Sequence, residues 1–500
     1  MRVSERGRDL ACLIAGLALP LAYAPFGAWP LAFLSQAVLY RCWLGANPGR
    51  ACRRGWLYGL GMFGAGTSWV QVSIHQFGLP VYAFSAGMTV LFVLFFALYP
   101  ALVGYAARRW INVSPCRQLL VVLPVTWTLG EWLRGFVLTG FPWLTLGYSQ
   151  IDGPLAAWAP VLGVFGVSLM TALAAGAVAA LPDTPKPAVA TVTGIALGSL
   201  LLARTVWTEA QGDPLSVTLV QGGIEQSIKW EPEKRQLTLD RYAALTEPHW
   251  GAGIVLWPET ALPAFHSQLA DYLGAMDRRA RAANTALLIG IPYDLHEAGR
   301  YAGRYYNSIV GLGTATGRYD KRHLVPFGEF LPLKELLAPM LSFLEIPMSD
   351  FTAGAAKQAP LLVAGDHAIG ASICYEDAFG EEVIDALPAA ALLVNVSNDA
   401  WFGDSIAPHQ HLEMARMRAA ETGRYLLRAT NNGVSAIIDP AGRLLARSPQ
   451  FTAHALTGEV RAQTGATPYV RSGNGPVVTI LLLGLLLARR HPGERRGLAV

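Results

Sequence analysis

Three side chains of different chemistry occur in separate segments of the second half of the chain. Cys374 directly follows the apolar run 369–373, Glu259 closely follows the apolar run 254–257, and Lys321 lies between them in the sequence. A thiol attacks a carbonyl carbon as the thiolate, so it needs a base, and the resulting oxyanion needs a cation or N–H donors. The three residues therefore predict an acyl-transfer site with Cys374 as nucleophile, Glu259 as general base and Lys321 as charge stabiliser.

Each of these residues also has an ordinary structural interpretation. A cysteine after a strand is commonly buried and inert, Glu259 would be a loop glutamate, and Lys321 a solvated surface lysine. The polar residues 375–377 after Cys374 and Pro258 before Glu259 favour the reactive interpretation. No C-x-x-C pair occurs, so the sequence supports neither a zinc site nor a disulfide framework. The other cysteines are Cys12, Cys42, Cys52 and Cys116.

Residues 213–465 have the composition of a globular domain that can position these side chains. Helical patterns occupy residues 232–247, 268–283 and 409–423. Strands alternating with helices predict an α/β sandwich with buried sheets, and such folds place reactive groups at strand ends. The β-rich runs predict strands at residues 215–221, 253–257, 286–290, 305–312, 369–374, 391–396, 425–430 and 434–438.

The remainder of the chain is too apolar for an ordinary soluble enzyme. Of its 500 residues, 52% are hydrophobic and only 15% are charged. We expect about eight transmembrane helices, seven in residues 1–208 and an eighth at 474–490, with a basic tail to residue 500. The apolar stretches begin near residues 10, 28, 56, 81, 119, 156, 189 and 476.

The basic residues indicate how these helices are oriented. The net charge is +4, and the arginines collect in short clusters between apolar runs, which does not suggest a nucleic-acid-binding stripe. Clusters lie before the first span and after the second, fourth and eighth, with Lys186 after the sixth. The positive-inside rule then predicts cytoplasmic termini and an external segment 213–465. An alternative interpretation makes residues 1–24 a cleavable signal peptide, which would leave that segment on the same side.

Short motifs around the three reactive residues resemble those of a known superfamily. Trp-Pro-Glu at 257–259, Lys321 followed by Val-Pro-Phe-Gly-Glu at 325–329, and Cys-Tyr-Glu at 374–376 resemble the Glu-Lys-Cys triad of the nitrilase superfamily. With a multi-span region attached, the chain resembles the apolipoprotein N-acyltransferase family. Further strings that resemble this family lie at 220–222, 229–230, 306–308, 395–403 and 428–433, and in the apolar part at 24–27, 131–135 and 140–143.

The resemblance implies a fold, a location and a reaction. The external segment would be a periplasmic α-β-β-α sandwich, and the chain a multi-pass protein of the bacterial inner membrane. Cys374 would take an acyl group from the sn-1 ester of a phospholipid and pass it, through a thioester, to the α-amino group of the diacylglyceryl-cysteine of an apolipoprotein. No metal or organic cofactor would be needed, and no nucleic acid would bind.

Four further residues would support the triad by this resemblance. Glu329 would orient or pair with Lys321, although a glutamate at a helix start is an equally good interpretation. Glu376 would tune proton transfer beside the nucleophile. Tyr375 and Trp230 would be walls of the pocket, with a plain core role as the alternative.

Residues 330–351 form an unusually apolar segment within the globular domain. They could pack in a core, or form a mobile arm that touches the membrane surface and guides acyl chains.

Two other functions fit part of the sequence. A membrane-tethered amidase would pass the acyl group to water, and a transporter would need charge pairs within the membrane, for which only Glu131 and Arg134 are candidates.

Overall fold

The structure is a computed structural model and describes residues 4–78, 80–111, 113–297, 300–330, 351–363 and 367–490. The chain divides into two compact units. The first comprises residues 1–71, 81–205 and 472–500, and the second comprises residues 72–80 and 206–471. All predicted site residues belong to the second unit.

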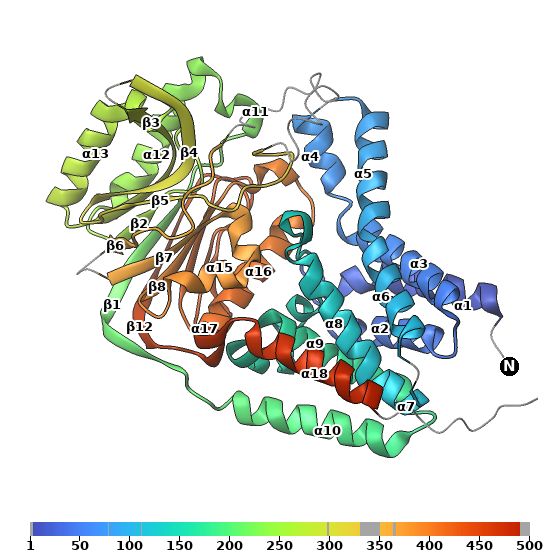
Figure 1. Cartoon of the computed structure of the whole chain (residues 1–500). Coiled ribbons are helices and arrows are strands. Elements are labelled where there is room, and N and C mark those ends of the chain that lie inside the picture. The colour runs from blue at the N-terminus through green and yellow to red at the C-terminus, as the bar shows by residue number, and fades with distance from the viewer. Residues whose placement is uncertain are drawn as a thin grey trace, which may run out of the picture. The chain divides into compact units, whose positions relative to one another are not determined.

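The described part of the second unit contains two six-stranded sheets (Figure 1). Their strand orders are β12-β1-β2-β3-β4-β5 and β11-β10-β9-β8-β7-β6. Within them β1, β2 and β3 run parallel, as do β7, β8 and β9, so the carboxyl ends of β2 and β7 are places for reactive groups. The strands are β1 (Thr208–Gln221), β2 (Ile254–Leu256), β3 (Ala286–Glu297), β4 (Arg300–Gly313), β5 (Arg318–Asp320), β6 (Leu361–Val363), β7 (His367–Ile373), β8 (Leu392–Ser397), β9 (Leu426–Thr430), β10 (Ala436–Ile438), β11 (Leu444–Arg447) and β12 (His454–Gly465).

Both sheets contribute side chains to one apolar core between them. Successive residues of a strand point to opposite faces, so Ile254 and Leu256 enter this core together with Val394 of β8. Val255 instead joins a second cluster with residues of α12 (Arg235–Thr246) and α13 (Ala270–Ala282). On the other sheet α16 (Ala407–Thr422) packs through Leu412 and Ala415. Figure 1 shows these helices beside their sheets, so the expected α-β-β-α sandwich is confirmed.

Strands or helices lie at every position where the sequence of this unit predicts one. The sequence does not predict four of the observed strands, β5, β6, β11 and β12. Three of these strands have only three or four residues, and β12 alternates buried with exposed polar residues such as Glu459 and Arg461. Short or polar edge strands carry little apolar periodicity, which is why the sequence does not reveal them.

In the first unit a helix occupies each of the eight stretches expected to span the membrane. Three helical stretches in the described part of the chain are long and apolar enough to cross it, namely Tyr82–Arg109, Pro154–Ala180 and Pro185–Leu202. Crossing by the other five stays a prediction. The helices are α1 (Glu5–Ala18), α2 (Pro30–Trp43), α3 (Pro48–Gly66), α5 (Tyr82–Phe96) with α6 (Leu98–Arg109), α8 (Leu123–Arg134), α9 (Ala159–Ala180), α10 (Pro185–Leu202) and α18 (Gly475–Arg490).

Helix length and charge explain why several stretches do not qualify. Helices α1 and α2 have 14 residues each, which is about 21 Å at 1.5 Å per residue, against a hydrocarbon core of about 30 Å. Helix α3 carries Arg54, whose buried guanidinium lies 2.8 Å from Glu5 and 3.1 Å from Asp9 of α1. These charges lower the apolar character of both helices, and their pairing joins α1 to α3.

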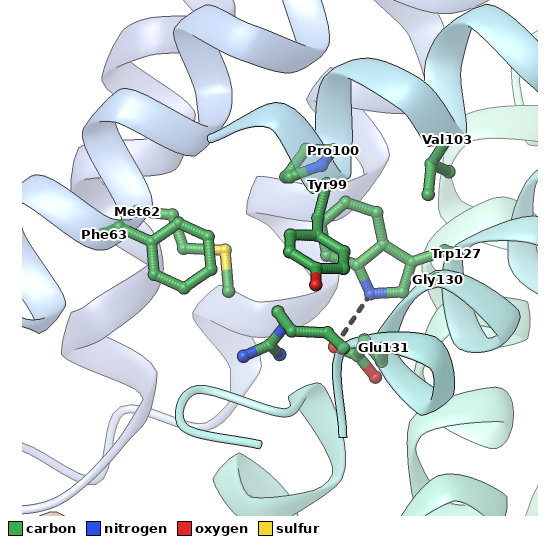
Figure 2. Close-up of a pocket in the computed structure, with 9 residues that line it drawn as sticks. Met62, Phe63, Tyr99, Pro100, Val103, Trp127, Gly130 and Glu131 are labelled. Carbon is green, nitrogen blue, oxygen red and sulfur yellow. Dashed lines mark hydrogen bonds between the residues drawn. The ribbon is translucent and has the colours of Figure 1, made fainter. Parts of the chain in front are cut away.

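A small cavity lies among α3, α6 and α8 (Figure 2). Its volume is about 20 Å³, enough for roughly one water molecule, whereas ligand pockets begin at about 300 Å³. On its wall Glu131 accepts hydrogen bonds from the indole N–H of Trp127 at 3.0 Å, dashed in Figure 2, and from the N–H of Leu146 at 2.8 Å. Arg134 donates to the carbonyl of Phe141 at 2.7 Å. Both charges therefore fasten the loop after α8 to that helix.

Candidate active site

Glu259 lies in a tight turn directly after β2. The next residue, Thr260, has a φ of 45°, in the left-handed region that non-glycine residues rarely adopt. Gly290 of β3 approaches this turn so closely that a Cβ there would lie 2.1 Å from the carbonyl oxygen of Pro258. Its carbonyl accepts a hydrogen bond of 2.8 Å from the N–H of Ala261. The neighbouring strand thus fixes the position of Glu259, and it does so only because residue 290 is glycine.

Lys321 lies at the centre of a buried polar group. It directly follows β5, and its Nζ lies 2.7 Å from Oε1 of Glu329 and 3.5 Å from Oε1 of Glu259. Asn307 of β4 donates from Nδ2 to the same two oxygens, at 2.7 Å for Glu259 and 3.4 Å for Glu329. One lysine, one asparagine and two carboxylates therefore meet in this group. They come from the ends of β2 and β5, the side of β4 and the loop after β5.

The charges of this group follow from burial and pairing. Burial alone would lower the pKa of Lys321, but the carboxylates of Glu329 and Glu259 outweigh it and raise that pKa, so the lysine is cationic. The second oxygen of Glu259, Oε2, is buried and accepts no hydrogen bond from the described residues. A carboxylate with one oxygen fixed and one free can accept a proton from a group placed beside it.

Cys374 is held at the end of β7 in an unusual backbone conformation. Its φ is 53°, again in the left-handed region, and it begins the short helical turn Cys374–Ala378. Burial raises the pKa of this thiol well above its ordinary value, Glu259 raises it further, and Lys321 opposes them. The thiol is therefore protonated at neutral pH. Glu259 and Lys321 both act on its charge, which is consistent with one common site.

Glu376 connects the segment of Lys321 to the turn of Cys374. One oxygen accepts from the N–H groups of Arg322 at 2.7 Å and His323 at 3.1 Å. The other accepts from the N–H of Ile373 at 2.7 Å and from a tyrosine hydroxyl. Burial raises the pKa of Glu376, although these donors oppose the shift. Both oxygens are occupied, so the geometry favours a role in positioning over the proton-transfer role expected from the sequence.

The two aromatic residues expected at the pocket differ in their surroundings. Tyr375 is buried, and its ring lies 5.8 Å from that of His323 and 5.0 Å from that of Phe379 in edge-to-face geometry. Trp230 is half-buried and directly follows the short helix α11 (Gln226–Lys229). Within the described residues no hydrogen bond or ring contact joins Trp230 to Glu259, Lys321 or Cys374.

Sequence reasoning missed two residues beside the general base. Asn307 contacts both Glu259 and Glu329. Lys229 is buried and donates from Nζ to the hydroxyl of Thr260 at 2.9 Å. Burial lowers the pKa of Lys229 to about 8, although Glu259 opposes the shift. Both residues lie in strings that resemble the family, 229–230 and 306–308, but nothing in the sequence places them beside Glu259.

The apolar arm expected at 330–351 falls mostly outside the described residues, which omit 331–350. At its far end Phe351 is buried, and its ring lies 4.9 Å from that of Tyr305 on β4. Its N–H donates to the carbonyl of Glu329 at 3.3 Å. Phe351 therefore lies beside Glu329. Among the described residues no group of His, Cys, Asp or Glu has the arrangement of a metal site.

Comparison with known proteins agrees with this geometry. Residues 216–469, which hold nearly all of the two sheets, match the family described as carbon-nitrogen hydrolase. Residues 15–177 match the apolipoprotein N-acyltransferase N-terminal domain.

Full-length relatives extend the comparison to the whole chain. The chain is 48% identical to the apolipoprotein N-acyltransferase of Methylococcus capsulatus, with 96% of each chain covered. It is 43% identical to that of Azotobacter vinelandii, with 97% of this chain and 95% of the relative covered. For that of Coxiella burnetii the identity is 41%, over 96% of this chain and 99% of the relative. The chain belongs to the apolipoprotein N-acyltransferase family.

Proposed function

We propose that this chain moves a fatty acyl group from the sn-1 ester of a phospholipid to the α-amino group of the N-terminal diacylglyceryl-cysteine of an apolipoprotein. Cys374 is the nucleophile, Glu259 the general base and Lys321 the cation that stabilises the oxyanion. The observation that carries this proposal is the buried group in which Lys321 lies 2.7 Å from Glu329 and 3.5 Å from Glu259. Its charges also act on the thiol of Cys374.

The first half-reaction forms a thioester. Because burial keeps the Cys374 thiol protonated, a base must act at the moment of attack, and Glu259 has a free buried oxygen for this proton. The sulfur then bonds to the ester carbonyl carbon, and the negative charge on the carbonyl oxygen is stabilised by Lys321 and backbone N–H groups. When the C–O bond breaks, the proton on Glu259 passes to the departing lysophospholipid.

The second half-reaction consumes the thioester. The α-amino group of the diacylglyceryl-cysteine attacks the same carbonyl carbon, and Glu259 takes a proton from the amine. Glu259 passes this proton to the sulfur as the C–S bond breaks, which returns the Cys374 thiol and the Glu259 carboxylate. Such an intermediate survives only where water is excluded. Cys374 is 9% exposed, which supports transfer to an amine over release to water.

Glu329 and Glu376 are positioning residues in this proposal. Glu329 holds the ammonium of Lys321, and its own second oxygen accepts from the N–H of Val325 at 2.8 Å. Glu376 holds the turn of Cys374 against the residues after Lys321. Tyr375, next to the nucleophile, and Trp230 are proposed as walls of the acyl-binding pocket.

The membrane arrangement belongs to the same proposal. Residues 1–208 contribute seven spans and residues 474–490 an eighth, in the bacterial inner membrane. Residues 213–465 face the periplasm and both termini the cytoplasm. The three long apolar helices and the clusters of arginine between apolar runs support this arrangement.

A two-substrate assay tests the function. Purified protein is incubated with phosphatidylethanolamine labelled in its sn-1 chain and a peptide that begins with diacylglyceryl-cysteine. We expect label on the peptide amine with the wild type and none with Cys374→Ala. Label that appears only as free fatty acid would favour the amidase, and transfer by Cys374→Ala would overturn the proposal.

A further inference from the structure

A buried set of charges lies behind Cys374 and takes no part in the proposed acyl transfer. This His411 cluster consists of Asp377, Asp399, His411 and Arg428, which come from four different elements. Each of the four residues is at most 2% exposed. Three of them lie after Cys374 in the sequence by more than 20 residues, so only the fold brings them to it.

The cluster reaches Cys374 through its backbone carbonyl. Nε2 of His411 lies 3.1 Å from the carbonyl oxygen of Cys374, and Nδ2 of Asn395 donates to the same oxygen at 3.2 Å. That carbonyl belongs to the residue whose φ is 53°. A left-handed residue other than glycine persists only when its surroundings hold it there, and these two donors do so.

His411 lies between two carboxylates. Its Nε2 is 2.9 Å from Oδ1 of Asp377 and its Nδ1 is 3.0 Å from Oδ1 of Asp399. Burial and the charge of Arg428 lower the pKa of His411, but the two aspartates prevail and raise it to about 9. Nε2 faces two acceptors, the carbonyl of Cys374 and Asp377, and therefore carries an N–H. Nδ1 lies 2.8 Å from Nη2 of Arg428 as well as 3.0 Å from Asp399.

Arg428 completes the set. It reaches Oδ2 of Asp377 at 3.0 Å and Oδ2 of Asp399 at 3.1 Å. Two carboxylates then face two cations, so each buried charge of the cluster has a partner of opposite sign. A buried charge without such a partner would destabilise the fold strongly. Asp377 lies in the same helical turn as Cys374, so the cluster holds that turn both at the carbonyl of Cys374 and at the side chain of Asp377.

We propose that His411 is a positioning residue for the nucleophile, which holds the carbonyl of Cys374 and thereby keeps the thiol in the orientation for attack. The inference rests on the proposed role of Cys374. It attributes the orientation of the Cys374 thiol to a residue of α16, a helix that carries none of the three triad residues. His411 does not touch the substrate or the reacting atoms. Its loss should therefore slow attack by sulfur without changing the affinity for phospholipid.

The test compares His411→Gln with Glu421→Gln, a matched control. Glu421 lies on the same helix, is equally buried and pairs with Arg418 at 2.8 Å, so both changes disturb buried charge in α16. Thioester formation is measured in a single turnover with labelled phosphatidylethanolamine. We expect kcat to fall about 100-fold in His411→Gln with KM unchanged, since a small misplacement of a reacting group has this effect. Folded Glu421→Gln should keep the wild-type kcat.

Alkylation of Cys374 by iodoacetamide, followed by mass spectrometry of its peptide, gives a second readout that needs no substrate. His411→Gln should change this rate at least tenfold, and Glu421→Gln should leave it unchanged. If wild type forms no thioester, the proposed function fails, and the alkylation rates still decide the positioning role. If His411→Gln does not fold, Asp377→Asn, which keeps the side-chain shape, should show the same loss of kcat to a smaller degree. Equal kcat and alkylation rates in a folded cluster variant and the control would overturn the inference.

Discussion

The carboxylate of Glu376 accepts a hydrogen bond of 2.7 Å from the backbone N–H of Arg322, the residue that follows Lys321. The same carboxylate accepts from the N–H of Ile373, which precedes Cys374. The cation and the nucleophile come from different sheets, and this side chain sets their separation.

Glu376→Gln should therefore impair catalysis although the side chain keeps its size. A glutamine offers one acceptor oxygen and turns an N–H₂ group toward backbone N–H donors, which costs about 1–3 kcal/mol for the buried groups left unpaired. We expect kcat for thioester formation to fall by roughly 10- to 100-fold. Glu381→Gln, an exposed glutamate of the same region, is the control. Similar rates for the two variants would show that Glu376 does not position the site.

Lys321→Met should abolish thioester formation and also destabilise the fold. It leaves the carboxylates of Glu259 and Glu329 buried without their cation, a change that typically costs about 3–5 kcal/mol. Adding Glu329→Gln should restore part of the melting temperature but none of the activity, because the oxyanion still lacks its cation. The exposed Lys234→Met is the control. Activity in the double variant would contradict the assigned role of Lys321.

Gly290→Ala tests whether β3 positions the general base. The new methyl group would lie 2.1 Å from the carbonyl oxygen of Pro258, so the turn of Glu259 must move. We expect a lower melting temperature and thioester formation slowed at least about tenfold. Gly274→Ala in α13 is the matched control, because its methyl group would meet only the end of Arg278 at 3.6 Å, and alanine stabilises a helix by about 1 kcal/mol relative to glycine. A wild-type rate in Gly290→Ala would show that the turn is not needed.

The His411 cluster predicts how stability depends on pH. The pKa of His411 is about 9 in the fold and near 6.5 in an unfolded chain, so its stabilisation is complete below pH 6.5 and is lost as the pH rises through 9. The corresponding loss of unfolding free energy is on the order of 3 kcal/mol. Asp377, Asp399 and Arg428 are the charged groups that face the ring. Melting temperatures at pH 6.5, 7.5 and 9 should therefore fall more steeply for wild type than for His411→Gln, and parallel curves would contradict this.

Much of the catalytic half follows from local sequence. The apolar runs before Glu259 and Cys374 are strands, because a short run closed by proline or polar residues suits a buried strand whose end carries function. The pairing of Lys321 with Glu329 can also be predicted from the sequence, since the two residues lie eight positions apart across a Pro-Gly turn.

The His411 cluster could not be predicted in this way. Helix α16 is rich in polar residues that sequence periodicity assigns to solvent, yet most of them are buried because their partners come from distant strands and turns. Asn307 is missed for the same reason, as its partners Glu259 and Glu329 lie on other segments. Apolar windows also do not give the number of spans, because α3 buries the charge of Arg54 in a pair with Asp9 of α1.

The most direct test of the central claim is the mass of the peptide that contains Cys374 after the protein is incubated with phosphatidylethanolamine alone. We expect one added acyl chain on Cys374, removed by neutral hydroxylamine as a thioester is, and passed to a diacylglyceryl-cysteine peptide when that is added. Glu259→Gln should show no added mass. An unmodified Cys374 in active wild-type protein, or an acyl group on another residue, would contradict the account.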